Sequence, residues 1–279
     1  MNKILVTVVI ITHNRSKLLK KAINSVLVQT YKNIEIVVVD DYSSDETQNI
    51  MEEIELNTDS LRYVRLEKPS GANIARNKGI NEATGEYVTG LDDDDEMLPS
   101  RIEKMLYNYD DKYAYVSSQV YFVNNSILKK KDFLRFKQII TLNDMLYTNC
   151  TGNQVFTKKQ MLIDAGLYDE ELVSAQDYDM WIRLLLIKPR AKMIKEPLML
   201  VDRNDFISRI SASNRKISGY FKVYKKYKKF MKKDHKKFQL FKLYLQKNKK
   251  LSFRLFFLFM PKNNLLQYLY INIKIIIKK

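Results

Sequence analysis

Glu86-Tyr-Val-Thr-Gly-Leu-Asp-Asp-Asp-Asp-Glu96 is the stretch from which the rest of the chain can be interpreted. Its first half is an apolar run typical of a buried strand, and its second half places five acidic side chains in a row. Hard cations such as Mg²⁺ prefer oxygen ligands, and they typically bind one or two carboxylates together with substrate phosphates. A solvated acidic turn that closes the strand and binds no cation explains the same residues equally well. The surrounding sequence has to decide between the two.

Strand-like and helix-like segments alternate before this stretch. Apolar, β-branched runs predict strands, and amphipathic stretches between them predict helices. The predicted strands cover residues 5–11, 34–39, 61–66 and 86–91, and the predicted helices cover 16–28, 45–55 and 72–83, the first capped by Ser16. Because the alternation demands crossover connections, the first hundred residues predict a parallel α/β sheet.

Polar clusters follow three of these strands, at residues 12–15, 40–45 and 92–96. In open α/β sheets, ligands bind beyond the carboxyl ends of the strands. Three polar clusters at such ends therefore predict one binding crevice, whereas one cluster alone would not.

Composition limits the classes of protein that fit. A single cysteine, Cys150, excludes a disulfide framework and fits a reducing cytosol, and only His13 and His235 are available as imidazole ligands, too few for a histidine-rich zinc site. The apolar run after Lys3 lacks a small-residue cleavage site, so we expect no secretory signal. No run reaches the ~20 apolar residues of a membrane span.

The net charge of +16 is concentrated at one end of the chain. Residues 215–279 carry 20 Lys and Arg against one acid, Asp234, whereas the remainder has a net charge of −3. Aromatic and aliphatic side chains interleave the lysines in a stripe, which consists of Phe221, Tyr224, Tyr227, Phe230 and Met231. We therefore expect two units, residues 1–210 and a lysine-rich amphipathic helical region at 211–279.

Five motifs occur in a fixed order along the first unit. They are Thr-His-Asn-Arg at 12–15, Val-Asp-Asp-Tyr-Ser-Ser-Asp-Glu-Thr at 39–47, Ala-Arg-Asn-Lys-Gly-Ile at 75–80, Gly-Glu-Tyr-Val-Thr-Gly-Leu-Asp-Asp-Asp-Asp at 85–95 and Asp-Tyr-Asp-Met-Trp-Ile-Arg-Leu at 177–184. Together they resemble the motifs of family 2 glycosyltransferases over residues 4–210. The resemblance implies the GT-A fold, a Rossmann-like, mostly parallel sheet flanked by helices. It also implies sugar transfer from a nucleotide diphosphate donor, expected here to be a UDP-sugar, with inversion and with Mg²⁺ or Mn²⁺.

The resemblance also assigns roles to individual residues. It places Thr12, His13, Asn14, Arg15, Asp41, Arg76, Asp92 and Asp93 in the donor pocket, Asp92 and Asp94 at the metal, and Asp177 as the general base. Two positions depart from the family pattern: Gln176 replaces a frequent Glu, and Ile11 replaces a frequent Pro. The first departure removes an acid that would support the base.

The residue types fit these roles. Asp92 and Asp94 alternate at a strand end, so both side chains point towards one side of the crevice. A carboxylate such as Asp177 can accept the proton of an attacking hydroxyl. Asp179 lies about 200° further around a helix and cannot face the same hydroxyl, so we expect it to be structural.

Other interpretations stay open at this point. Asp177 is also a natural acid for a first helical turn, and Arg76 is also an ordinary helix arginine. We expect Asp40 to be structural, Asp45 to be a helix cap, and Asp95 with Glu96 to be local structure.

Other functions are weaker. A nucleotidyltransferase would need a glycine-rich loop after the first strand, and an oxidoreductase would need G-x-G-x-x-G; neither is present. A catalytically inactive scaffold would not need Asp94 or Asp177.

The basic region suggests partners. Lysines interleaved with aromatic residues favour an anionic membrane surface, which fits a glycan or lipid-linked saccharide acceptor and a cytoplasmic position at the inner face of the cell membrane. Nucleic acid is not expected, since no recognition motif occurs, and a homo-oligomer formed through the stripe is an alternative. The donor sugar and the linkage leave no signature in the sequence.

Overall fold

The computed structural model describes residues 4–124, 127–131, 137–203 and 215–247. Its strands are β1 Val6–Thr12, β2 Ile34–Asp40, β3 Leu61–Arg65, β4 Tyr87–Asp92, β5 Asp95–Met97, β6 Val116–Asn124, β7 Ile127–Lys131, β8 Ile139–Thr141, β9 Phe156–Lys158 and β10 Arg190–Asp202. These described strands form one sheet in the order β3-β2-β1-β4-β9-β6-β10-β5, with β7 beside β6 and β8 beside β10.

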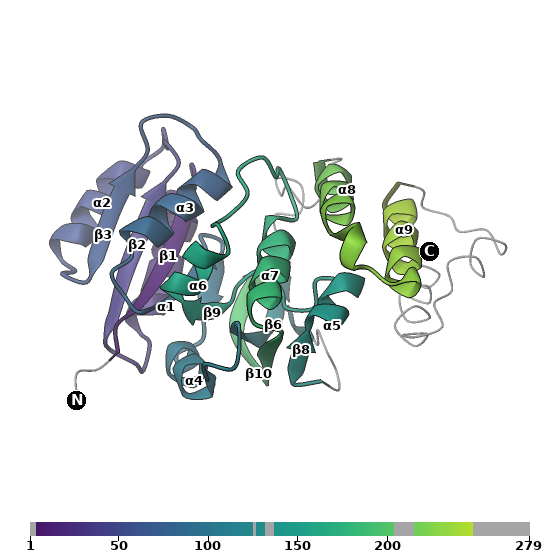
Figure 1. Ribbon diagram of the computed structural model, residues 1–279. Coiled ribbons are helices and arrows are strands. Elements are labelled where there is room, and N and C mark those ends of the chain that lie inside the picture. Colours follow the sequence, from purple (N-terminus) through teal and green to yellow (C-terminus); the bar gives the residue numbers. More distant parts are fainter. Residues whose placement is uncertain (1–3, 125–126, 132–136, 204–214, 248–279) are drawn as a thin grey trace.

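Helices cover both faces of this sheet (Figure 1). They are α1 Ser16–Leu27, α2 Thr47–Leu56, α3 Ala72–Glu82, α4 Arg101–Asn108, α5 Leu142–Tyr147, α6 Lys159–Asp164, α7 Gln176–Ile187, α8 Arg215–Tyr227 and α9 Lys233–Lys247, with a short 3₁₀ turn at Lys228–Phe230. The predicted α/β class is therefore confirmed, and the early elements lie within a few residues of their predicted bounds.

The first half of the sheet is parallel, as predicted. β3, β2, β1 and β4 are parallel neighbours. Thr12 pairs in register with Asp40, and Ile11 with Asp92, so three strands end at the same edge. In the second half, β9 runs antiparallel to β4 and β6, and β5 runs antiparallel to β10. The sheet as a whole is thus mixed.

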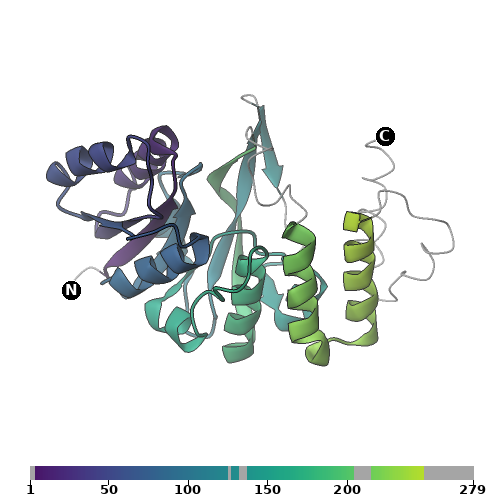
Figure 2. The same ribbon diagram turned by 90° about the horizontal axis from the view of Figure 1, so that it is seen from above.

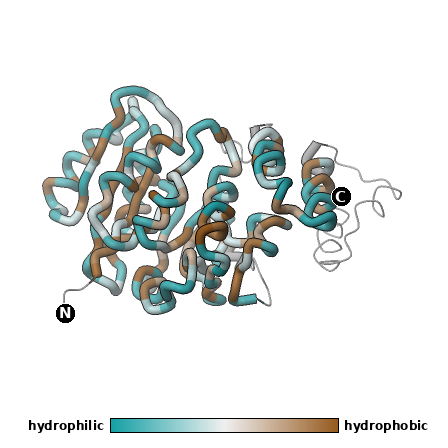
Figure 3. The backbone as a smooth tube through the Cα atoms, in the orientation of Figure 1, coloured by the Kyte–Doolittle hydropathy of each residue, from teal (hydrophilic) through white to brown (hydrophobic). Residues whose placement is uncertain are grey.

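Each central strand contributes to a core on both faces. Val8 and Ile10 pack with Ile23 of α1 on one face, whereas Val9 packs with Ile80 of α3 on the other. Because successive side chains of a strand point to opposite faces, a strand covered by helices on both sides is apolar at most of its positions. This is why the runs of Val and Ile form the central strands, which appear as brown interior segments in Figure 3.

The start of α1 differs from its prediction. Ser16 is the first helical residue rather than the cap, and its backbone N–H donates to Asp45 Oδ2 at 3.1 Å. Asp45 was expected to cap the next helix, but the N-cap of α2 is Glu46. Asp45 lies one residue earlier, and its Oδ1 accepts from the backbone N–H of Thr47 at 3.0 Å. One carboxylate therefore ties the first turns of two helices together.

The helices α8 and α9 lie side by side next to α7, at the end of the molecule opposite the N-terminal strands (Figure 2). Tyr227 and Met231 of the predicted stripe are buried in the core cluster that contains α7, whereas Phe221 is 43% and Phe230 41% exposed. The stripe is thus split between the core and the surface. The division of the chain at residue 210 stays a prediction, and residues 248–279 lie outside the described part.

Within the described residues, none of the helices combines the length and the apolar character needed to cross a bilayer.

Candidate active site

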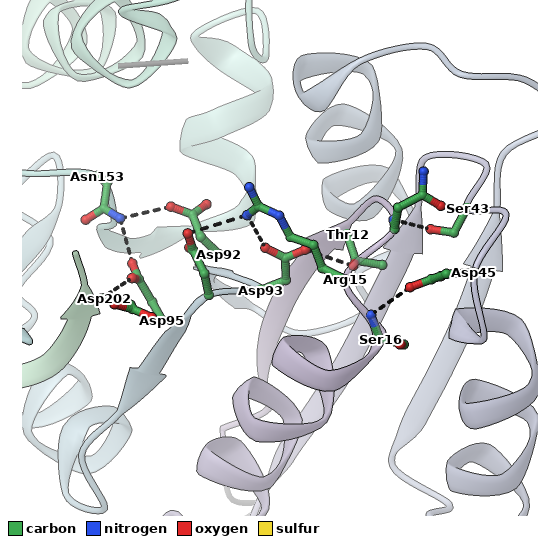
Figure 4. A network of polar contacts seen from close by, with 12 residues as sticks. Thr12, Arg15, Ser16, Ser43, Asp45, Asp92, Asp93, Asp95, Asn153 and Asp202 are labelled. Carbon is green, nitrogen blue, oxygen red and sulfur yellow. Dashed lines mark hydrogen bonds and ion pairs between the residues drawn. The ribbon is translucent and has the colours of Figure 1, made fainter. Parts of the chain in front are cut away.

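The loop after β1 contacts the acidic stretch through two of its predicted site residues. Thr12 Oγ1 donates to Asp93 Oδ2 at 2.9 Å, and Arg15 Nη1 lies 3.1 Å from Asp93 Oδ1 and 3.4 Å from Asp94 Oδ2. Asp93 is 6% exposed, and burial raises the pKa of its carboxyl to about 6 although Arg15 and Thr12 favour the charged form. Asp93 therefore faces the β1 loop and fixes it to the end of β4 (Figure 4).

The other two residues of that loop contact the loop after β2 instead. His13 Nδ1 is within hydrogen-bonding distance of the Asp41 carbonyl oxygen, at 2.8 Å. The backbone N–H of Asn14 donates to Ser43 Oγ at 2.8 Å, and Asn14 Oδ1 accepts from the backbone N–H of Ser44 at 2.7 Å. His13 and Asn14 are exposed. The four predicted residues thus form two pairs. Thr12 and Arg15 contact the acidic stretch, whereas His13 and Asn14 contact the loop after β2.

The two acids after β2 have different surroundings. Asp40 is fully buried and accepts from Ser43 and from the Tyr63 hydroxyl, which is the structural role expected of it. Asp41 accepts from the backbone N–H groups of Ser70, at 2.6 Å, and Gly71, at 2.8 Å. It therefore orders the turn that begins α3.

The acidic stretch itself folds into a cluster of three carboxylates. Asp92, Asp94 and Asp95 each offer an oxygen, and these oxygens lie within 4.8 Å of one another. Asp92 and Asp94 were predicted to meet, whereas Asp95 was expected to be local structure only. The short turn between β4 and β5 brings Asp95 back beside Asp92, which a spacing argument along a single strand does not foresee.

Two amides that the sequence did not single out bind this cluster. Asn153 Nδ2 donates to Asp92 Oδ2 at 2.9 Å and to Asp95 Oδ2 at 3.0 Å, and Gln154 Nε2 donates to Asp92 Oδ1 at 3.1 Å. Figure 4 shows Asn153 between the two acids, with Asp202 on the far side of Asp95. An Asn-Gln pair in a loop carries no recognisable signal, so only the folded chain reveals it.

Arg76 connects the acidic cluster to helix α7. Its Nη2 donates to Asp92 Oδ1 at 3.0 Å, and its side chain is 13% exposed, so it is not an ordinary surface arginine. Burial alone would lower the pKa of Arg76, but the carboxylates of Asp92 and Asp177 raise it overall. Its Nη1 is shielded from solvent and makes no hydrogen bond within the described residues.

Asp177 lies in the first turn of α7, near Arg76 and Asp92. The side chain is partly buried, and its Oδ1 is shielded from solvent without a hydrogen-bond donor among the described residues. Burial raises the pKa of the Asp177 carboxyl to about 7; Arg76 opposes the rise and Asp92 adds to it. The backbone turns just before α7, where Ala175 adopts a left-handed conformation with φ 61°.

The three carboxylates have the chemistry that a hard divalent cation requires. They supply oxygen ligands only, and they leave room for phosphate and water oxygens at the remaining positions, which is the pattern that Mg²⁺ and Mn²⁺ sites follow. Arg15 lies 3.4 Å from Asp94 Oδ2 and Arg76 lies 3.0 Å from Asp92 Oδ1, so each guanidinium contacts one member of the cluster. A cation held there by Asp92, Asp94 and Asp95 would stabilise charge on a diphosphate.

The sequence model of Glycosyl transferase family 2 matches residues 7–165 of the chain. This range includes all of the site loops described above, but it ends before helix α7, which carries Asp177. The chain therefore belongs to glycosyl transferase family 2.

Relatives support the same class over more of the chain. The putative colanic acid biosynthesis glycosyl transferase WcaA of Escherichia coli is 33% identical over 257 residues, which cover 91% of this chain and 92% of that protein. The GalNAc(5)-diNAcBac-PP-undecaprenol beta-1,3-glucosyltransferase of Campylobacter jejuni is 30% identical over 182 residues, which cover 64% of this chain and 59% of that protein.

Solved structures share the fold at low sequence identity. S. aureus TarS residues 1–349, in complex with UDP-GlcNAc, superimposes with a TM-score of 0.70 at 20% identity over 89% of this chain and 76% of that one. The mannosyltransferase PcManGT from Pyrobaculum calidifontis, in complex with GDP-Man and Mn²⁺, superimposes with a TM-score of 0.61 at 19% identity. The superposition covers 86% of this chain and 69% of that one. The GT-A fold expected from the motifs is thus confirmed, and the chain is a glycosyltransferase.

Proposed function

We propose that this enzyme transfers a sugar, with inversion, from a nucleoside diphosphate donor, for which a UDP-sugar is the first choice, to a hydroxyl of a glycan or lipid-linked saccharide. Asp177 is the general base in this proposal. The observation that carries it is the arrangement of Asp177, whose Oδ1 has no hydrogen-bond donor among the described residues, across Arg76 from the acidic cluster. A carboxylate oxygen that has no donor among the described residues, opposite a diphosphate site, lies where an attacking hydroxyl would need a proton acceptor.

The residues proposed to bind the donor lie mainly in the loop after β1, in the two pairs described above. His13, Asn14 and Asp41 would bind the base and ribose, because they expose polar atoms on a loop that is already ordered by its own hydrogen bonds. Arg15 and Arg76 would approach the diphosphate, since both lie against the acidic cluster. Thr12 and Asp93 would hold the β1 loop in place between these two groups.

The proposed cofactor is Mg²⁺ or Mn²⁺, held by Asp94 and Asp92 together with Asp95. Such an ion acts as a Lewis acid that stabilises the negative charge of the leaving diphosphate. The residues of the chain do the rest: Arg76 holds Asp92 in place, and Asp177 accepts the proton of the acceptor hydroxyl, a role for which a pKa near the working pH is suited.

The acceptor class rests on the relatives. One of them is named for colanic acid biosynthesis, and another for acting on a polyprenyl diphosphate-linked saccharide. Both names favour a cell-surface glycan or its lipid-linked precursor as the acceptor, and a position at the cytoplasmic face of the cell membrane follows from that proposal.

Nucleotide binding with and without Mn²⁺ tests the donor and metal assignments together. Mn²⁺ with UDP should raise the unfolding temperature of the full chain more than either alone, because a ligand that binds only the folded state stabilises it. Asp94→Ala should remove the Mn²⁺-dependent part and retain the effect of UDP alone. Transfer that persists in Asp94→Ala with a chelator present would contradict the metal assignment, and a response to no nucleotide would contradict the donor class.

Helix α8 and the 3₁₀ turn Lys228–Phe230 that follows it support a second part of the proposal, contact with an anionic membrane. Phe221 and Phe230 are exposed, and Lys225 and Lys229 lie over their rings at 4.6 and 5.1 Å. Aromatic rings of this kind can enter the interface while the lysines attract anionic lipid.

Vesicle binding tests this contact. Deleting residues 251–279 should weaken binding to vesicles that contain an anionic lipid, and the double variant Phe221→Ser/Phe230→Ser should weaken it further. Equal binding of wild type and both variants, or equal binding to purely zwitterionic vesicles, would argue against the membrane assignment.

A further inference from the structure

We propose that Asn153 is a positioning residue that fixes the separation of Asp92 and Asp95 and thereby sets the affinity of the acidic cluster for a divalent cation. This inference rests on the metal-assisted transfer proposed above, and it assigns a function to a loop that the sequence motifs leave without a role.

A single nitrogen atom holds both carboxylates. Asn153 Nδ2 has two hydrogens, and it donates one to Asp92 Oδ2 at 2.9 Å and the other to Asp95 Oδ2 at 3.0 Å. Because the two N–H bonds of an amide are coplanar and diverge at a fixed angle, they hold the two acceptors at a fixed separation. The other oxygen of Asp95 accepts from the backbone N–H of Asp202 at 3.2 Å, so the orientation of Asp95 is set from both ends.

An amide is suited to this place because it is neutral. Three carboxylates within 4.8 Å repel one another, and hydrogen-bond donors stabilise them. Arg15 and Arg76 already donate to the edges of the cluster, and a third cationic side chain between Asp92 and Asp95 would compete with a bound metal. Asn153 donates hydrogen bonds without cancelling the charge that attracts the cation.

The loop that carries Asn153 is held firmly on its N-terminal side. Asn149 Oδ1 accepts from the backbone N–H groups of Thr151, at 3.1 Å, and Gly152, at 3.2 Å, and Asn149 Nδ2 donates to the Gly152 carbonyl at 2.9 Å. That carbonyl also accepts from Trp181 Nε1 of α7 at 3.0 Å. The loop is therefore fixed to the helix that carries Asp177.

Its C-terminal side is held by close packing. Gln154 Oε1 lies so near Gly90 that a Cβ at residue 90 would be 2.1 Å away. Gln154 Nε2 meanwhile donates to Asp92 Oδ1. A loop fixed at both ends is what a positioning residue requires, since outer donors that orient metal ligands typically change metal affinity about 10–100-fold when removed.

The test is a Mn²⁺ titration of the full chain at a fixed UDP concentration, followed by the unfolding temperature. In Asn153→Ala, the Mn²⁺ concentration for the half-maximal rise, measured from the variant's own metal-free unfolding temperature, should increase about 10–100-fold, while the effect of UDP alone stays near that of the wild type. Gln48→Ala removes a surface amide that donates to Glu52 at 3.0 Å, and it should leave the titration unchanged.

Asn149→Ala separates donation from loop order, because Asn149 orders the same loop and donates to neither carboxylate. If it shifts the Mn²⁺ titration as much as Asn153→Ala does, the effect is loop order and the inference is wrong. If the wild type responds to Mn²⁺ and the half-maximal Mn²⁺ concentration of Asn153→Ala lies within twofold of the wild-type value, the inference about Asn153 fails and the proposed metal assistance stands. If wild type does not respond to Mn²⁺ at all, the proposed metal assistance fails, and the role of Asn153 fails with it.

Discussion

Two acids in the first turn of α7, only two residues apart, have opposite surroundings. Asp179 is fully buried, and it accepts from Arg183 Nε at 2.8 Å and from the Tyr227 hydroxyl at 2.7 Å, with Lys226 Nζ at 2.9 Å. Asp177 has an Oδ1 with no hydrogen-bond donor within the described residues, although Arg76 lies nearby.

The difference separates structure from chemistry. The donors around Asp179 come from α7 and α8, so its carboxylate joins the C-terminal helices to the rest of the fold. The site around Asp177 leaves Oδ1 without a hydrogen-bond donor among the described residues, which costs stability and suits the proton acceptor that we propose. Residues that carry chemistry are often held in such unfavourable surroundings. Two substitutions, followed by three measurements, test whether the two acids differ in this way.

The largest effect should be on catalysis by Asp177→Asn. A general base contributes about 10²–10⁴-fold to the rate, so transfer should fall by that factor, and UDP binding with Mn²⁺ should stay close to that of the wild type. Steady-state rates and nucleotide titrations measure the two separately. Lost nucleotide binding at full structural integrity would instead assign Asp177 to the donor side.

The next effect should be on stability, in Asp179→Asn. Removing this charge leaves Arg183 and Lys226 without their shared partner, and breaking a buried ion pair costs about 3–5 kcal/mol. Denaturant unfolding measures the loss, which should far exceed any change in the rate per folded molecule. A variant as stable as wild type but inactive would reverse the roles of the two acids.

The smallest effect should be the pH dependence that Asp177 gives to stability. Its pKa is raised from the ordinary 3.8 to about 7 in the folded chain. Between these values the folded state keeps a proton that the unfolded state has lost, so this contribution to stability is full below about pH 4 and is lost as the pH rises through 7.

Asp177→Asn should therefore be the more stable protein at pH 8, by about 1–2 kcal/mol once the partial exposure of the side chain is allowed for. The gain over wild type should shrink towards pH 5. Denaturant unfolding at both pH values measures it, and Asp179→Asn should show the opposite sign at pH 8. A stability difference that does not change with pH would remove the argument that Asp177 is held in an unfavourable site.

Parts of the site could be read from the sequence because local patterns encode them. The β-branched runs predicted the parallel half of the sheet, and their ends predicted where polar residues meet. The second half could not be read in the same way, since β5, β8 and β9 are three-residue strands whose partners lie far along the chain. Strands this short carry too few residues to show a period.

The sequence by itself determined the fold class and the family, and it identified Asp92, Asp94 and Asp177 as candidate site residues, because motif order and strand-end placement follow from local chemistry. Only the tertiary structure brought Asp95 into the acidic cluster, placed Asn153 between two carboxylates more than fifty residues away, and buried Asp179 among donors from another helix. These features depend on contacts between distant segments, and hydrogen bonding and burial decide the state of a carboxylate only once those contacts exist.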